Sequence, residues 1–177
     1  MLVDLINIKR LRLIAMYAAY LSLAFFFQDS VFNNLRIFGV KPLFIPAAVV
    51  AIGMFEQGIW GGALGLFIGL VADRCMGYSA LFTILFPVIG FFSGILSRWL
   101  INKRFVAFIA AGFAAILVTG MFQILTVWAF YGQMKATMFI NALIQAAISI
   151  PFTAPLYVPC KWINAKFGYV KFGKGLQ

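Results

Sequence analysis

The side chains that could perform chemistry are few in this sequence. The chain contains no histidine, and its acidic residues are Asp4, Asp29, Glu56 and Asp73. Acid–base catalysis by histidine is therefore excluded, and catalysis by paired carboxylates requires two of these four acids to meet. A zinc site is unfavourable as well, because the only soft ligands are two cysteines. We expect a protein that is not an enzyme and that binds no metal and no cofactor.

The composition is that of an integral membrane protein. Of the 177 residues, 64% are hydrophobic and 10% are charged, and the mean hydropathy is +1.04. A bilayer core about 30 Å thick needs roughly 20 apolar residues per helical crossing, so the chain has room for about six crossings in a single transmembrane domain. Charges and turn-forming residues predict helices at residues 12–28, 42–55, 58–73, 79–97, 105–130 and 136–160.

Two of these boundaries depend on particular residues. The first predicted span is expected to remain as an anchor, because no small-residue cleavage site follows it. Pro42 is placed in the first turn of the second span, where proline is tolerated.

The 14 basic residues predict the orientation of the spans, because cytoplasmic loops carry an excess of Lys and Arg. With the N-terminus inside, ten of them lie on the cytoplasmic side and four on the outer side. We therefore predict an N-in, C-in protein whose basic, aromatic tail at 161–177 contacts anionic lipids. The net charge of +10 is attributed to this anchoring and not to nucleic-acid binding. In this topology the acids, and the cysteines Cys75 and Cys160, are divided between the two sides.

The third predicted span carries a stripe of glycines. Gly61, Gly65 and Gly69 recur every four residues and therefore share one helix face. A shorter version of the pattern, Gly90 and Gly94, occurs in the fourth span. Small residues let helix backbones approach closely in lipid. The stripe is predicted to pack against another helix, which belongs either to this chain or to a partner protein.

Asp73 ends the glycine-rich span near the predicted outer surface, where a carboxylate can be hydrated or paired. It is followed by Arg74 and, after two more residues, by Gly77. We predict that these three residues fix the outer turn. The remaining strong polar groups in the spans include the amides Gln123 and Gln145, which either hydrogen-bond between helices or face a ligand.

Between about residues 20 and 97, the order of these features resembles the MreD family of bacterial rod-shape proteins. In that family the first span ends in Gln and a short outer loop leads to Gly-x-x-Pro, which Gln28, Gly39 and Pro42 match. The glycine stripe ending in Asp is similar to the family pattern too. One departure is that Leu43 follows Pro42, where the family commonly has Asp or Asn.

Membership of this family would imply a six-helix membrane fold that resembles the S components of energy-coupling-factor transporters. It would also imply a non-enzymatic subunit of the cell-wall elongation complex in the bacterial cytoplasmic membrane. Such a subunit binds an MreC-like protein and helps couple MreB filaments to a RodA-like glycosyltransferase and its transpeptidase.

The alternative is an S component itself. It would bind a vitamin-like molecule in an outward-facing cavity and would meet an energising subunit through small residues of the first span, here Ala15 and Ala19.

Overall fold

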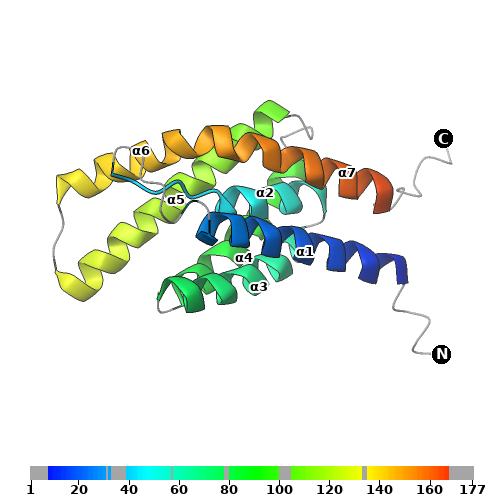
Figure 1. The fold of residues 1–177 in the computed structure, drawn as a ribbon, viewed down its shortest axis with the longest axis horizontal. Coiled ribbons are helices and arrows are strands. Elements are labelled where there is room, and N and C mark those ends of the chain that lie inside the picture. The colour runs from blue at the N-terminus through cyan, green and yellow to red at the C-terminus, as the bar shows by residue number, and fades with distance from the viewer. Residues whose placement is uncertain are drawn as a thin grey trace.

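The computed structural model of the chain describes residues 8–30, 32, 39–56, 58–77, 80–99, 105–132 and 135–167. These residues form a helical bundle, which confirms the predicted all-α class (Figure 1). The helices are α1 (Ile8–Ser30), α2 (Ile45–Phe55), α3 (Gly58–Met76), α4 (Leu81–Trp99), α5 (Phe105–Tyr131), α6 (Ala136–Thr153) and α7 (Tyr157–Phe167). A short 3-10 helix, η2 (Ala154–Leu156), joins α6 to α7.

Four helical stretches of the described chain are long and apolar enough to cross a bilayer. They are Leu11–Ser30, Gly58–Met76, Phe105–Phe130 and Ala136–Lys166, the last of which runs through η2 into α7. The apolar helices Ile45–Phe55 and Leu81–Ser97 are shorter. Because a crossing helix needs roughly 20 apolar residues, these four stretches identify a membrane protein.

Several predicted boundaries differ from the structure, and α1 begins at Ile8, four residues before the predicted start at residue 12. The second helix begins at Ile45 and not at residue 42, so Pro42 lies in a non-helical segment, and Pro46 occupies the first helical turn instead. At the other end of the chain, α7 continues to Phe167. The first seven residues of the predicted tail, 161–167, are therefore helical, and residues 168–177 lie outside the described part of the chain.

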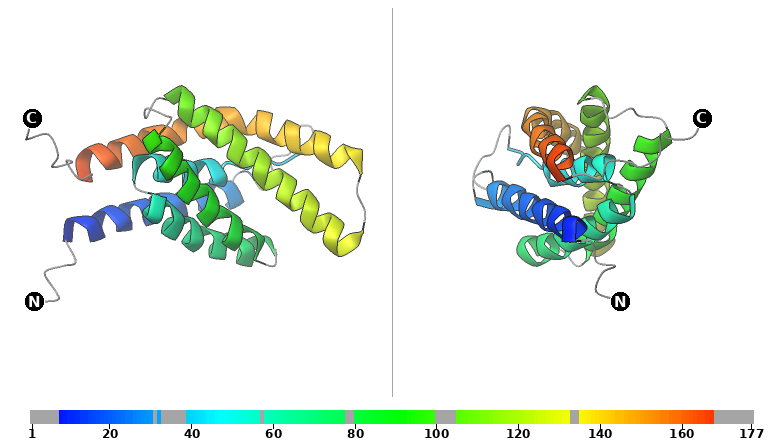
Figure 2. Two further views of the ribbon diagram at one scale, coloured as in Figure 1. Left: turned by 180° about the vertical axis from the view of Figure 1, so that it is seen from behind. Right: turned by 90° about the vertical axis from the view of Figure 1, so that its right-hand side faces the viewer.

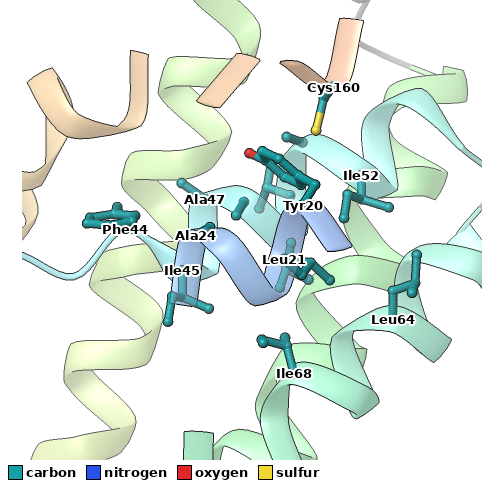
Figure 3. Close-up of a cluster of buried hydrophobic side chains, with 14 of the residues drawn as sticks. Tyr20, Leu21, Ala24, Phe44, Ile45, Ala47, Ile52, Leu64, Ile68 and Cys160 are labelled. Atoms are coloured by element: carbon teal, nitrogen blue, oxygen red, sulfur yellow. The ribbon is translucent and has the colours of Figure 1, made fainter. Parts of the chain in front are cut away.

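The short helix α2 forms the centre of the bundle. All of its residues are buried, and α1, α3, α4, α5 and α7 pack around it (Figures 1 and 2). Figure 3 shows Leu21 and Ala24 of α1, together with Leu64 and Ile68 of α3, in the buried cluster around this helix. Since protein covers every side of α2, its apolar side chains are shielded from lipid.

The hairpin of α5 and α6 extends beyond the other helices. In Figure 1 both helices run to the left past α3 and α4, while the Ile8 end of α1 and the Phe167 end of α7 lie at the opposite end. Gly120 of α5 is close to α6, because a Cβ on this glycine would lie 3.1 Å from the Cβ of Ala142. Beyond this contact, large side chains such as Phe130 and Ile140 are exposed.

Candidate functional site

The predicted glycine stripe lies inside the bundle, between α3 and α4. Ideal Cβ atoms on Gly61, Gly65 and Gly69 would lie 2.7, 2.6 and 2.5 Å from carbonyl oxygens of α4. Only glycine permits such an approach, because real Cβ atoms essentially never come this close to another atom. Gly90 and Gly94 face α3 from the opposite side of this interface. The groove is therefore filled by α4 of the same chain.

Asp73 connects the end of α3 to the start of α4. Its carboxylate is 7% exposed and accepts hydrogen bonds from the backbone N–H groups of Phe82 and Thr83, at 2.9 and 2.7 Å, and from the Thr83 hydroxyl at 2.6 Å. Backbone N–H groups in a first helical turn lack helical partners, and a negative charge is favourable there. The carboxylate thus caps α4.

Gly77 and Arg74, the other two residues predicted to fix this turn, lie at the end of α3. Gly77 closes α3, because its N–H donates to the Asp73 carbonyl at 3.1 Å and its φ of +73° favours glycine. Arg74 is exposed, and its charge lies in the last turn of α3, where a cation interacts favourably with the helix dipole. The partners of the Asp73 carboxylate are groups of α4 and not this guanidinium.

Gln28 has the corresponding role for α2. Its side chain is 5% exposed, and its Oε1 accepts hydrogen bonds from the backbone N–H groups of Phe44 and Ile45 at 2.9 and 3.0 Å. These donors lie at the N-terminus of α2, so an amide oxygen of α1 caps a separate helix. Gly39 lies ahead of this segment with a φ of +78°, a backbone conformation that side chains rarely adopt.

The non-helical segment before α2 is held by α6. The Ser149 hydroxyl oxygen accepts a hydrogen bond from the Leu43 N–H at 2.9 Å, and the Gln145 Nε2 donates to the Lys41 carbonyl at 2.9 Å. Pro42 lies between them and has no N–H to satisfy. These long-range bonds satisfy two polar backbone groups of a segment that has no helical hydrogen bonds of its own.

Polar side chains of three other helices hold the opposite end of α2. The Ser97 hydroxyl of α4 donates to the Met54 carbonyl at 2.9 Å. The carboxylate of Glu56, directly after α2, accepts from Asn164 of α7 at 3.2 Å and from the Tyr17 hydroxyl of α1 at 3.4 Å. These contacts could not be predicted from the sequence, because each joins two single groups that are 39 to 108 positions apart.

A polar cavity of about 400 Å³ lies at the N-terminal end of α2. Its lining includes Gln28, Lys41, Gln123 and Gln145, which come from α1, the segment before α2, α5 and α6. A second cavity of about 240 Å³ lies between α5 and α6, and it shares Gln123 and Gln145 with the first and adds Asn141. The two cavities therefore meet at two amide side chains.

The described residues hold no cluster of three or more His, Cys, Asp or Glu side chains that could bind a metal ion. Cys75 is exposed at the end of α3, whereas Cys160 is buried in α7. The polar groups of this region can cap helices, hold the segment before α2 and bind a small polar molecule. No family model matches this sequence, and neither a curated protein nor a solved structure is significantly similar to it.

Proposed function

We propose that this chain is a non-enzymatic, multi-pass subunit of the bacterial cell-wall elongation complex, with a role like that of the MreD family. Its proposed partners in the cytoplasmic membrane are an MreC-like protein, a RodA-like glycosyltransferase and its transpeptidase. MreB filaments are an indirect partner. The observation that carries this proposal is that the residues of the family motif act together in one structural unit.

The motif residues are far apart in the sequence but serve the same substructure. Gln28 caps α2, and Gly39 lies where the chain approaches that helix. The glycine stripe lets α3 contact α4 through the backbone, and Asp73 caps α4. A chance likeness to one glycine-rich helix would not require a glutamine of α1 to cap α2. The cooperation of these residues supports the family resemblance.

We also propose six crossings with both ends in the cytoplasm. The 11 residues of α2 rise about 16 Å. The segment 41–44 adds up to about 13 Å, so together the two approach the thickness of a bilayer core, about 30 Å. The Ile8 and Phe167 ends lie on the same side of the bundle in Figure 1, as an even number of crossings requires.

The positions of two acids support a non-enzymatic role. Glu56 and Asp73 both accept hydrogen bonds that hold helix ends. A general base must be within hydrogen-bond reach of a substrate proton, and both of these carboxylates are engaged with the protein itself.

Partner helices must bind outside the glycine groove, because α4 occupies it. The outward faces of α3, α4 and α5 carry exposed aromatic side chains, including Phe67, Phe92 and Trp128. We propose these faces as the contact surfaces for the synthase subunits.

A second candidate is a solute-binding component of an energy-coupling-factor transporter. The polar cavity of about 400 Å³ favours it, because such a component binds its solute in an outward-facing cavity.

The test is purification of the tagged chain from its native membrane in a mild detergent, followed by mass spectrometry of the bound proteins. An unrelated multi-pass protein with the same tag is the control. Specific recovery of the MreC-like and RodA-like proteins is expected. Recovery of paired ATPases with a transmembrane energising subunit would favour the second candidate instead, and specific recovery of neither set would contradict both.

A further inference from the structure

We propose that the two cavities form one binding site for a neutral, hydroxyl- or amide-bearing group, and that Gln123 recognises this group. The cavities, about 400 and 240 Å³ in volume, share Gln123 and Gln145 in their linings. Sites for small molecules have volumes on the order of 300–1,000 Å³, so the larger cavity alone is sufficient. This inference is independent of the scaffold proposal, and it deepens the second candidate function because it rests on the same cavity.

The side chain of Gln123 lines both cavities and makes no hydrogen bond to any residue that the structure describes. Its neighbours in α5 behave differently, because the hydroxyls of Thr119 and Thr126 each donate to a carbonyl of their own helix at 2.8 Å. Gln123 is thus the strongly polar group of this helix that is directed into open space.

Gln123 lies deep within the candidate membrane span Phe105–Phe130. The eight residues that follow it in α5 rise about 12 Å, which places Gln123 about that far from the end of the helix. At such a depth an amide without a hydrogen-bond partner is unfavourable. Polar residues within spans that face a cavity commonly mark a ligand pathway. The amide therefore needs a partner inside the cavity.

The chemistry of the lining selects the ligand class. Gln123 and Asn141 offer both donors and acceptors without charge. The Nε2 of Gln145 is bonded to the Lys41 carbonyl, but its Oε1 accepts from no described residue and can accept from a ligand. Among the described residues of its lining, the larger cavity has one acid, Asp29, and one base, Lys41. A neutral group with several hydroxyls or amides matches these contacts.

This chemistry has two possible sources. A free solute would enter the larger cavity from the side of the membrane where α3 ends, since Cys75 and Met76 belong to its lining. A lipid headgroup would instead enter between α5 and α6, beyond the close contact of Gly120 with Ala142, where Asn141 is exposed.

The native cysteines provide the assay. Cys75 is exposed and lines the larger cavity, whereas Cys160 is fully buried, so a water-soluble maleimide reports on Cys75 in the folded protein. The full-length chain in phosphatidylglycerol nanodiscs is alkylated with and without each of two probes. The free probe is N-acetylglucosamine in the buffer, and the lipid probe is a glucosyl-diacylglycerol in the nanodisc.

We expect one of the probes to slow alkylation of Cys75. At about ten times its Kd, a bound probe slows the reaction roughly tenfold by mass action. Protection by N-acetylglucosamine identifies a solute site, and protection by the glucosyl lipid identifies a headgroup site. Gln123→Leu should abolish the protection, and Gln123→Met should do the same if the leucine variant fails to fold. Thr126→Val, on the same helix but outside both linings, should retain it.

Absence of protection by both probes in the folded wild-type protein would overturn the proposal. Equal protection of the wild-type protein and a folded Gln123 variant would overturn it as well. Neither result would affect the scaffold proposal, which is tested by co-purification.

Discussion

Replacing Gly65 with alanine should force α3 and α4 apart. The added Cβ would lie 2.6 Å from the carbonyl oxygen of Phe86, 2.8 Å from its carbonyl carbon and 3.0 Å from the nitrogen of Pro87. All three atoms belong to the backbone, so no side chain can rotate away. Ordinary contacts begin near 3.4 Å, and the shortest of these distances must therefore lengthen by about 0.8 Å, which moves one helix against the other.

Gly62→Ala is the matched control on the same helix. A Cβ at Gly62 would lie 3.5 Å from the Pro87 oxygen and 3.7 Å from the Phe91 Cβ, which are ordinary contacts. Both substitutions gain about 1 kcal/mol of helix propensity. Overpacking at Gly65 costs about 1–3 kcal/mol, and the resulting displacement of α3 against α4 also weakens the neighbouring contacts of the glycine stripe. We therefore expect Gly65→Ala to destabilise the protein by about 1–2 kcal/mol and Gly62→Ala to stabilise it slightly.

Thermal unfolding in a mild detergent measures this difference. For a chain of this length, 1 kcal/mol changes the Tm by about 2–4 °C, so Gly65→Ala should melt about 2–8 °C below the wild type. Gly62→Ala should melt at or above the wild-type temperature. The interpretation of the interface would be refuted if Gly65→Ala melted like the wild type, or if both variants lost the same stability.

Three other experiments test the helix caps and the topology. Asp73→Ala removes the cap of α4 and should cost about 1–3 kcal/mol in the free energy of unfolding, whereas Asp73→Asn should cost less because it keeps one acceptor. An unchanged free energy of unfolding in Asp73→Ala would show that the carboxylate does not cap α4. Gln28→Leu leaves two buried N–H groups unsatisfied, so hydrogen exchange in the first turn of α2 should accelerate by roughly tenfold or more, and unchanged protection would contradict the cap. In intact cells, a membrane-impermeant maleimide should label Cys75, and Cys160 should react only after denaturation. Labelling of Cys75 only after the inner face is opened would reverse the proposed orientation.

Hydropathy and turn residues were sufficient to predict most helix positions. The predicted span 105–130 corresponds to α5, Phe105–Tyr131, and the predicted span 58–73 corresponds to α3, Gly58–Met76. The glycine spacing indicated a close helix contact but left its partner open, because a small-residue face has the same sequence whether it packs within a chain or between chains. Only the placement of α4 against α3 identifies the partner.

The entry into α2 could not be predicted, because its stability depends on distant residues. An average of hydropathy does not distinguish a full helix from a non-helical segment followed by a short helix. The segment is stabilised by Gln28, which is 16 residues from Phe44, and by Gln145 and Ser149, which are more than 100 residues from their partners. The sequence left open whether Gln145 bonds to another part of the chain or faces a ligand. In the structure its Nε2 bonds to the backbone while its Oε1 remains available.

The anchoring of the segment before α2 by α6 has a consequence for the synthesis of the protein. Leu43 and Lys41 emerge from the ribosome long before Ser149 and Gln145, which follow 106 and 104 residues later. Until the last hairpin is inserted, these backbone groups have no α6 partners, and α2 is too short to be stable in lipid by itself. The growing chain must therefore keep α2 next to water or the insertion machinery. Completion of the bundle then depends on α6, so a chain truncated before α6 would be a substrate for membrane proteases.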